Sequence, residues 1–299
     1  MADYGQELQF GMFVTPSVAG MEHVVDLVRR SEAAGLDLVT FQDHPYQASF
    51  LDTWTLMSYL AGITSRIRIA SNVIDLPLRP PAVLARSAAS LDRLSGGRFE
   101  LGLGAGAFWE AIEAMGGTRL TPGQSVDALR EAIDVIRQIW DTDAAGGVRV
   151  EGEHYRVVGA KRGPAPAHDI GLWIGAYKPR MLRLIGELAD GWLPSVEYLA
   201  GGVAELSDLN ARIDEGALAA GRDPKSILRM VNVMSARLGP TSSGYLQGPA
   251  SQWVEQLTAT ALEHGISGFL MGGDDPHTAE VLGNEIAPAV REAVAAARA

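Results

Sequence analysis

The sequence predicts an α/β fold, a (β/α)8 TIM barrel with inserted segments, formed by a single domain over residues 1–299. Short apolar segments typical of strands alternate with amphipathic segments typical of helices along the whole chain, which indicates repeated βα units and a parallel sheet. The strand-like segments number about eight, and barrels of this kind reach such a length as one domain. No low-complexity linker or run of like charges divides the chain.

Each unit of the first half has a recognisable strand and helix. The second helix follows Asp52, a suitable N-cap, and the third begins at Pro80 and Pro81 and stops at the glycines 96 and 97. The predicted strands are Gln9 to Pro16, Leu36 to His44, Ile67 to Ile74 and the segment that starts at Phe99, with helices at Glu22 to Ala34, 53–62 and 82–94.

The second half continues the pattern with three interruptions. Residues 107–124 and 239–249 are longer than ordinary βα loops, and 148–158 alternates like a β-hairpin inserted into the barrel. The predicted strands are Gly171 to Ala176, Gly191 to Val196, Leu228 to Leu238 and Gly268 to Gly273, and the helices are Ser125 to Trp140, a segment from Pro179, Glu205 to Ala220, Ala250 to His264 and His277 to Ala297.

Composition excludes several classes of function. The chain has no cysteine, which rules out disulfides, thiolate metal sites and a cysteine nucleophile, and its histidines show no metal-ligand spacing. A formal net charge of -11 argues against nucleic-acid and anionic-membrane binding. The first residues do not resemble a secretory signal, and no apolar run approaches membrane-spanning length, so we expect a cytoplasmic protein.

The glycine-rich strand from Phe99 is the strongest local signal. If it is extended, Phe99, Leu101 and Leu103 face one side, whereas Gly102, Gly104 and Gly106 leave the other side almost bare. Such a surface would accept a flat ring system, or it could merely let a tightly curved sheet pack. The spacing does not match the dinucleotide-binding fingerprint.

Active sites of such barrels lie at the carboxyl ends of the strands, where Asp43 and His44 follow the second strand. A histidine there can exchange protons near neutral pH, and we expect Asp43 to orient it; the alternative is a histidine that only caps a loop.

Asn72 ends the third strand and offers an amide to a ring carbonyl or imide, unless it only secures its own turn. Four large apolar residues are expected either to line a substrate cavity or to belong to the core: Trp109, Trp192, Met115 and Met271.

A phosphate site is predicted where Gly175 and Ala176 end a strand and Pro179 begins a helix. Free N–H groups at a helix N-terminus favour a phosphate, and Lys178, Arg180 and Arg183 add positive charge to an otherwise acidic chain. The alternative is a solvated basic helix face.

Six motifs in register resemble the bacterial luciferase-like monooxygenase superfamily, which contains flavin-dependent monooxygenases and oxidoreductases that use the deazaflavin coenzyme F420. The motifs cover nearly the whole chain: AAGLDLVTFQDH, RIRIASNVIDLPLRPPAVLAR, LSGGRFELGLGAG, LWIGAYKPRML, ADGWLPS and NEIAPAVRE. The resemblance implies a barrel with a cofactor across its mouth, a small-molecule substrate and a homodimer.

The resemblance also assigns roles to residues. His44 matches the histidine beside the reactive ring edge, and Ser71, Asn72 and Val73 match a bulged strand end, often with a non-proline cis bond, against the ring. Gly104, Ala105 and Gly106 match the strand that approaches the ring closely. The phosphate loop corresponds to Gly175, Ala176, Tyr177, Lys178, Pro179 and Arg180.

One departure limits the substrate. The deazaflavin-dependent sugar-phosphate dehydrogenases of the family carry a glutamate where this chain has Ala107, so sugar-phosphate oxidation is not expected. The pattern is closer to the methylene-tetrahydromethanopterin reductase-like group. The main hypothesis is therefore hydride transfer between coenzyme F420 and a small organic substrate. An FMN-dependent monooxygenase served by a separate reductase and a non-catalytic cofactor-binding barrel remain as alternatives.

Overall fold

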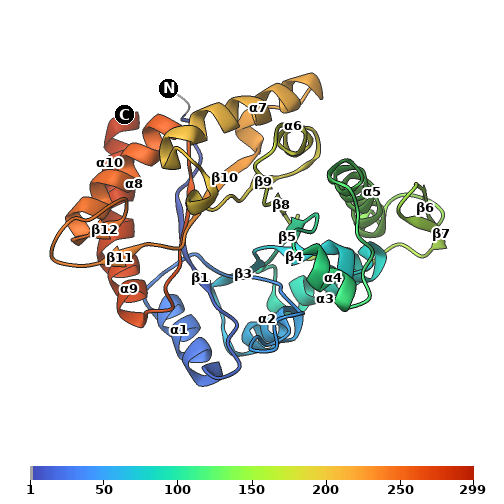
Figure 1. Ribbon diagram of the computed structural model, residues 1–299, viewed down its shortest axis with the longest axis horizontal. Coiled ribbons are helices and arrows are strands. Elements are labelled where there is room, and N and C mark those ends of the chain that lie inside the picture. Colours follow the sequence, from blue (N-terminus) through green and yellow to red (C-terminus); the bar gives the residue numbers. More distant parts are fainter. Residues whose placement is uncertain (1–2) are drawn as a thin grey trace.

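The computed structural model describes residues 3–299 and confirms the predicted barrel (Figure 1). Eight strands pair in parallel in the order of the sequence, and the last pairs with the first to close the ring. They are β1 (Gln9–Val14), β2 (Leu38–Phe41), β3 (Arg68–Ser71), β5 (Phe99–Gly104), β8 (Leu172–Ile174), β9 (Gly191–Trp192), β10 (Leu228–Val233) and β13 (Gly268–Met271).

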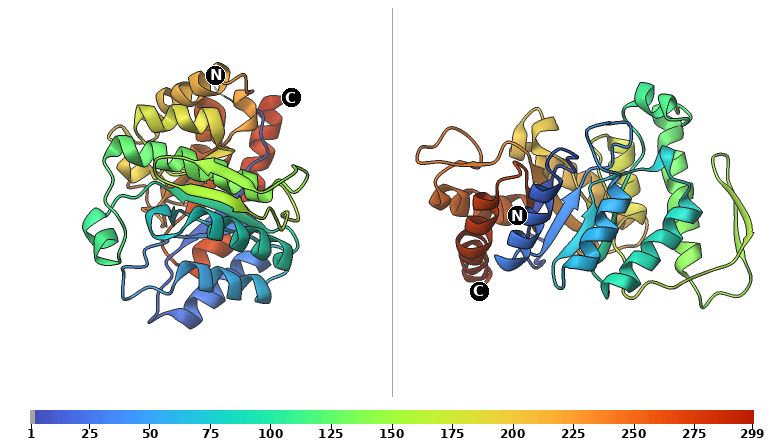
Figure 2. Two further views of the ribbon diagram at one scale, coloured as in Figure 1. Left: turned by 90° about the vertical axis from the view of Figure 1, so that its right-hand side faces the viewer. Right: turned by 90° about the horizontal axis from the view of Figure 1, so that it is seen from below.

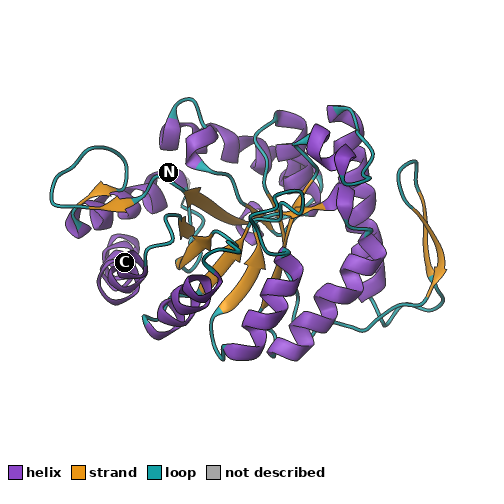
Figure 3. Ribbon diagram, turned by 60° about the horizontal axis from the view of Figure 1, so that its bottom comes forward, coloured by secondary structure: helices purple, strands orange, loops and turns teal. Residues whose placement is uncertain are grey.

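Helices surround the strands on the outside (Figure 3). Their ends follow the predicted signals: Asp52 accepts a hydrogen bond from the Thr55 backbone N–H at 2.9 Å, and Gly96 closes its helix with a φ of 74°. The helices are α1 (Met21–Ala33), α2 (Thr53–Ile63), α3 (Pro81–Ser95), α4 (Trp109–Ala114), α5 (Pro122–Trp140), α6 (Pro179–Leu188), α7 (Leu206–Ala219), α8 (Ala250–His264), α9 (Pro276–Val281) and α10 (Ala287–Arg298), with a π-helical turn at Leu282–Ile286 and short 3-10 turns at Leu76–Leu78, Val196–Tyr198, Gly202–Glu205 and Pro224–Ser226.

Two small strand pairs lie outside the barrel, on opposite sides of it (Figures 1 and 2). The predicted hairpin is β6 (Val148–Glu151) with β7 (Arg156–Ala160), and Glu131 of α5 ties its turn down by accepting three backbone N–H groups. The other pair is β11 (Arg237–Leu238) with β12 (Gln247–Gly248). The seventh barrel strand therefore ends at Val233 rather than at Leu238, because the chain leaves the barrel to form this pair.

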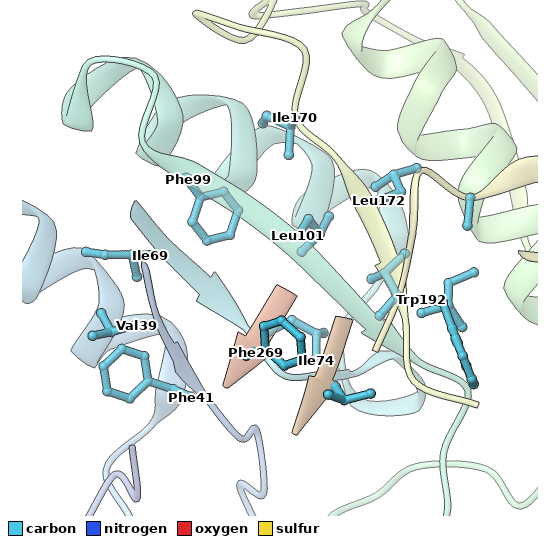
Figure 4. Packing of buried hydrophobic residues seen from close by; sticks show 14 of the residues in the cluster. Val39, Phe41, Ile69, Ile74, Phe99, Leu101, Ile170, Leu172, Trp192 and Phe269 are labelled. Carbon is cyan, nitrogen blue, oxygen red and sulfur yellow. The ribbon is translucent and has the colours of Figure 1, made fainter. Parts of the chain in front are cut away.

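The core has two layers, because successive residues of a barrel strand point alternately outward and inward. Phe99, Leu101 and Leu103 pack outward against the helices, and Figure 4 shows part of this layer. A smaller cluster fills the barrel: Phe13, Leu38, Ala70, Trp173, Leu193, Met230 and Leu270.

The expectation that Trp192 and Met271 line a substrate cavity is wrong. Both side chains are fully buried in the outer layer. Their strand neighbours Leu193 and Leu270 are the ones that face the barrel interior. Alternation along a strand shows which residues share a face, but it does not reveal which face is inside.

The third strand carries a bulge. β3 pairs Ala70 with Glu100, and its continuation β4 (Ile74–Asp75) pairs Ile74 with Leu103, so four steps along one strand oppose three along β5. The peptide bond between Asn72 and Val73 lies in this bulge and is cis, as the resemblance implied. The predicted continuous strand to Ile74 is therefore split in two.

Candidate active site

A cavity of about 190 Å³ lies at the carboxyl ends of β2, β4, β5 and β8, where barrel enzymes carry their active sites. Side chains or backbone of all four segments line it: Asp43, His44, Tyr46, Asn72, Val73, Ile74, Asp75, Gly104, Ala105, Gly106, Ala107, Phe108 and Gly175. Larger grooves occur between outer helices and at the opposite end of the barrel, but they do not adjoin these strand ends.

Val73 forms the apolar floor of this cavity. A Cβ atom added to Gly104 would lie 2.7 Å from Val73 Cγ2, and one added to Gly175 would lie 3.5 Å from Val73 Cγ1. The side chain of Val73 therefore sits between the ends of β5 and β8. The bulge covers part of the bare glycine face, so a ring in this cavity would meet Val73 beside Gly104 rather than the glycines alone.

Gly102 shows the same close approach one step deeper in the barrel. A Cβ atom there would lie 2.1 Å from the carbonyl oxygen of Ser71, which no side chain could tolerate. Ser71 is fully buried, donates to the carbonyl of Gly102 at 2.9 Å and accepts from its N–H at 3.0 Å. Ser71 thus fixes the bulge to β5 and does not itself line the cavity.

Asn72 is brought to the cavity, but its amide group points to partners inside the barrel. Its Nδ2 donates to Asn232 Oδ1 at 2.7 Å and to Thr40 Oγ1 at 3.0 Å, and its Oδ1 accepts from Asn232 Nδ2 at 3.2 Å. The expected amide handle for a ring carbonyl is therefore already used within the protein. The role of Asn72 is to hold the bulge.

His44 follows β2 and lines the cavity, as predicted. Its Nδ1 shares a hydrogen bond of 2.9 Å with the Tyr46 hydroxyl, and within residues 3–299 its Nε2 has no hydrogen-bond partner. Burial lowers the pKa of His44, although the charge of Asp43 opposes this, so the neutral imidazole is favoured near pH 7. Burial also raises the pKa of Tyr46, which keeps its proton.

Asp43 lines the cavity but does not orient His44, so that expectation is wrong. Its carboxylate accepts two hydrogen bonds from the Arg79 guanidinium, at 2.7 and 2.8 Å, and one from the backbone N–H of Asp75 at 3.1 Å. A bidentate pair of this kind is geometrically specific. Asp43 therefore joins the end of β2 to the segment after the bulge.

Asp75 was not recognised from the sequence. It is only 7% exposed and lines the cavity, and its Oδ1 has no hydrogen-bond partner among the described residues. Burial and, to a smaller extent, the charge of Asp43 raise the pKa of Asp75, Arg79 opposes both, and the net result is a pKa of about 7. A signal was present, because Asp75 interrupts the apolar run V-I-D-L-P-L where the strand reaches the barrel mouth.

The predicted phosphate loop begins in the cavity and leads away from it. Gly175 is a lining residue, and the chain then enters α6, whose first N–H groups have no partners within the helix. Lys178 is exposed. The positive charge is smaller than expected, since Arg180 pairs with Asp127 of α5 and Arg183 lies 3.7 Å from Glu215 of α7.

Two further loop residues hold the predicted phosphate loop in place. The backbone carbonyl of Ala176 accepts from Trp192 Nε1 at 2.9 Å, and the hydroxyl of Tyr177 accepts from the Ser195 backbone N–H at 2.8 Å. Burial raises the pKa of Tyr177. Both contacts join the end of β8 to the end of β9.

The excursion after β5 forms one wall of the cavity. Phe108 lines it, and its ring lies 5.4 Å from the His44 ring between centroids. Trp109 packs over Gly106, where an added Cβ would lie 2.8 Å from the indole Cη2. Trp109 thus supports the rim, and sequence reasoning missed both Phe108 and Tyr46.

Within residues 3–299, no cluster of three or more histidine, aspartate and glutamate side chains is placed to hold a metal ion. The same part of the chain contains no helix of the length and apolarity that crossing a bilayer requires.

Comparisons with known proteins agree with the barrel fold. The family model described as luciferase-like monooxygenase matches residues 8–238. The chain is 30% identical to an F420-dependent glucose-6-phosphate dehydrogenase of Nocardia farcinica over 238 residues, which cover 76% of this chain and 68% of that protein. It is also 30% identical to a 5,10-methylenetetrahydromethanopterin reductase of Methanolobus tindarius over 220 residues, 74% of this chain and 63% of that one.

A solved structure shows the same architecture over nearly the whole chain. It is an F420-dependent secondary alcohol dehydrogenase in complex with an F420-acetone adduct, with a TM-score of 0.83 and 19% identity over 95% of this chain and 99% of that one. At this identity the likeness establishes the fold alone. The match of the family model over most of the sequence establishes that the chain belongs to the luciferase-like monooxygenase family.

Proposed function

We propose that the protein is an oxidoreductase that moves a hydride between coenzyme F420 and a small organic substrate. The observation that carries this proposal is a single cavity at the strand ends that His44, the Asn72–Val73 bulge, Gly104 and Gly175 all line. Relatives of this chain that are named as F420-dependent enzymes support the choice of coenzyme.

The residues fit a flat, partly polar ring system. Val73 offers an apolar floor, Phe108 an aromatic wall, and His44 Nε2 and Asp75 Oδ1 are polar atoms without protein partners in the described chain. The cavity is smaller than the roughly 300–1,000 Å³ of pockets that enclose whole ligands. We therefore expect it to hold the ring of the coenzyme.

The remainder of the coenzyme would lie along the start of α6. Gly175 joins the cavity to that helix, whose free N–H groups and positive dipole end favour a phosphate group. Ala176, Tyr177, Lys178, Pro179 and Arg180 would surround it, with Lys178 the cation that remains free to approach. The coenzyme when bound supplies the hydride chemistry, and the protein supplies orientation and proton handling.

The substrate is expected to be a small organic molecule rather than a sugar phosphate. Ala107 lines the cavity at the place where the sugar-phosphate dehydrogenases of this family carry an acid. Phe108 and Trp109 supply apolar surface beside it. We expect an alcohol or carbonyl compound of low polarity to enter between this wall and His44.

An FMN-dependent monooxygenase with a separate reductase is the second candidate. It is favoured by the family model, which is named for monooxygenases, and Val73 and Phe108 would suit a flavin ring as well as a deazaflavin ring. The two candidates differ in their need for oxygen.

The deciding experiment compares the two chemistries. Purified protein is supplied with oxidised coenzyme F420 and a panel of alcohols without oxygen, and separately with reduced FMN and oxygen. Alcohol-dependent loss of the F420 absorbance that His44→Ala abolishes would support the proposal. Protein-dependent transfer of an oxygen atom from O2 to an organic substrate with reduced FMN would instead support the monooxygenase, because free reduced FMN consumes oxygen without an enzyme.

We further propose a homodimer that forms through α1, α2 and α3. An apolar groove of about 650 Å³ lies between α1 and α2, and one of about 550 Å³ lies between α2 and α3. Tyr59 and Leu94 border these grooves with 56% and 86% of their surfaces exposed. Contiguous exposed apolar surface of this kind marks a site where another protein binds, because monomeric proteins rarely leave such patches open to solvent.

A further inference from the structure

Asp75 is the one carboxyl group of the cavity without a counter-ion. It ends β4 opposite Gly104 of β5, at the mouth of the barrel. Its Oδ1 is buried and accepts no hydrogen bond within residues 3–299. A carboxylate with one buried oxygen that lacks both a cation and a donor is disfavoured, whereas a protonated carboxyl group is better tolerated.

The nearby arginine makes no hydrogen bond to Asp75 and instead binds two other carboxylates. Arg79 Nε and Nη2 donate to Asp43 at 2.7 and 2.8 Å, and Nη2 also donates to Asp52 at 2.8 Å. One positive charge thus faces three carboxyl groups. The two that bind the guanidinium share its charge, and Asp75 remains without a partner.

The other groups around Asp75 also favour its neutral form. Asp43 lies close enough to raise the pKa of Asp75, and the charge of Asp75 in turn helps raise the pKa of Tyr46. Burial, the largest effect, acts in the same direction, and only Arg79 opposes it. His44, across the cavity wall, has a lowered pKa and adds no positive charge near pH 7.

We propose that Asp75 is the acid of this cavity, a carboxyl group that carries a proton near neutral pH and exchanges it with an oxygen atom of the substrate. This role rests on the proposed function. With a bound reduced deazaflavin as the source of hydride for a carbonyl carbon, Asp75 would give its proton to the carbonyl oxygen, which would leave an alcohol and an aspartate carboxylate. In the reverse direction, the carboxylate takes the proton of the alcohol.

The placement suits this role in two respects. Ala107 gives the cavity no acid of its own at the end of β5, and the hydrogen bond to Tyr46 occupies one nitrogen of His44. The pKa of Asp75 is raised and that of His44 is lowered, so the cavity holds an acid beside a neutral imidazole. Enzymes that divide proton transfer between two groups show such opposite pKa shifts.

The first test needs no cofactor. Infrared spectra of the protein alone are recorded from pH 5 to 9 for the wild type, Asp75→Asn and Asp52→Asn. We expect a band from a protonated carboxyl group that disappears with a midpoint near pH 7, is missing in Asp75→Asn, and remains in Asp52→Asn, which removes a charge beside Arg79 outside the cavity. A wild-type protein without any protonated carboxyl band above pH 5 would overturn the proposal.

The second test separates Asp75 from the coenzyme assignment. Asp75→Asn keeps a polar side chain of the same size in the cavity and should therefore still bind oxidised coenzyme F420 saturably, but it should reduce a carbonyl substrate about 100-fold or more slowly, the usual contribution of a general acid. The pH dependence of the reduction rate near pH 7, which we attribute to Asp75 in the wild type, should also be absent in Asp75→Asn. An unchanged rate and pH profile would refute the role of Asp75, whereas a wild type that does not bind F420 would refute the proposed function and leave the infrared result to decide the protonation of Asp75.

Discussion

The side-chain amides of Asn72 and Asn232 hydrogen-bond each other inside the barrel, at 2.7 and 3.2 Å, although the residues lie 160 positions apart in the chain. Asn72 directly follows β3, and Asn232 lies on β10, which is not a neighbour of β3 in the barrel. The contact ties the bulge under the cavity to the far side of the barrel. It is therefore the first contact to test.

Asn232→Ala should destabilise the fold by about 1–3 kcal/mol, because it leaves buried amide atoms of Asn72 unpaired. The measurement is the free energy of unfolding in urea. The same variant should weaken coenzyme binding, since Asn72 precedes Val73 in the bulge. Unchanged stability and unchanged binding would show that the amide pair does not hold the bulge.

Gly102→Ala should prevent normal folding or lower the melting temperature sharply, because its Cβ would overlap the Ser71 carbonyl oxygen at 2.1 Å. Gly62→Ala is the matched control, since nothing lies within 4 Å of a Cβ at this exposed position of α2. The control should raise stability by up to about 1 kcal/mol, the usual gain of alanine over glycine in a helix. Equal effects of the two substitutions would contradict the close approach of the bulge to β5.

His168, which lies at the opposite end of the barrel from the cavity, should make the free energy of unfolding depend on pH. Its hydrogen bond to Glu100 raises the pKa of His168, burial opposes this, and Asp92 adds to the increase through a contact of 2.8 Å. Since the folded pKa lies above the unfolded value of about 6.5, the stabilisation is complete below pH 6.5 and is lost as pH rises through the folded pKa. The difference in unfolding free energy between the wild type and His168→Gln should therefore be largest near pH 6 and smaller at pH 9. A difference in unfolding free energy that stays the same from pH 6 to pH 9 would contradict a raised pKa of His168 in the folded protein.

Leu94→Glu should convert the proposed dimer to a monomer, because it places a charge in the exposed apolar groove between α2 and α3. Leu218→Glu on α7 provides the control, since Leu218 is also well exposed, at 67%, but lies outside that face. Light scattering after size-exclusion chromatography measures the mass of each variant. A wild-type monomer, or a dimer that survives Leu94→Glu, would reject this interface.

The sequence was sufficient for the architecture because each βα unit repeats local signals. The strands, the Asp52 cap, the Gly96 stop and the inserted hairpin follow from short-range patterns, and the structure confirms them. The division of the third strand into β3 and β4 depends on how closely Gly102 approaches Ser71. That relationship joins segments about thirty residues apart, and no local pattern encodes it.

The site was predicted in position but less well in detail. His44, Val73, Gly104 and Gly175 come together as expected, because strand ends of a closed barrel must meet at one mouth. The pairing of Asp43 with Arg79 and the isolation of Asp75 depend on which side chains compete for one guanidinium. Such competition is decided by the three-dimensional arrangement alone.

Equilibrium titration tests whether this cavity binds the ring of coenzyme F420. The fluorescence of F420 is followed while wild-type protein is added, in parallel with FMN and with Gly104→Leu, whose added side chain would collide with Val73 and displace the floor of the cavity. We expect saturable binding of F420, weaker binding of FMN, and loss of F420 binding in Gly104→Leu, provided that its circular dichroism spectrum matches the wild type. F420 fluorescence that does not change on addition of the wild-type protein would refute binding of the coenzyme in this cavity.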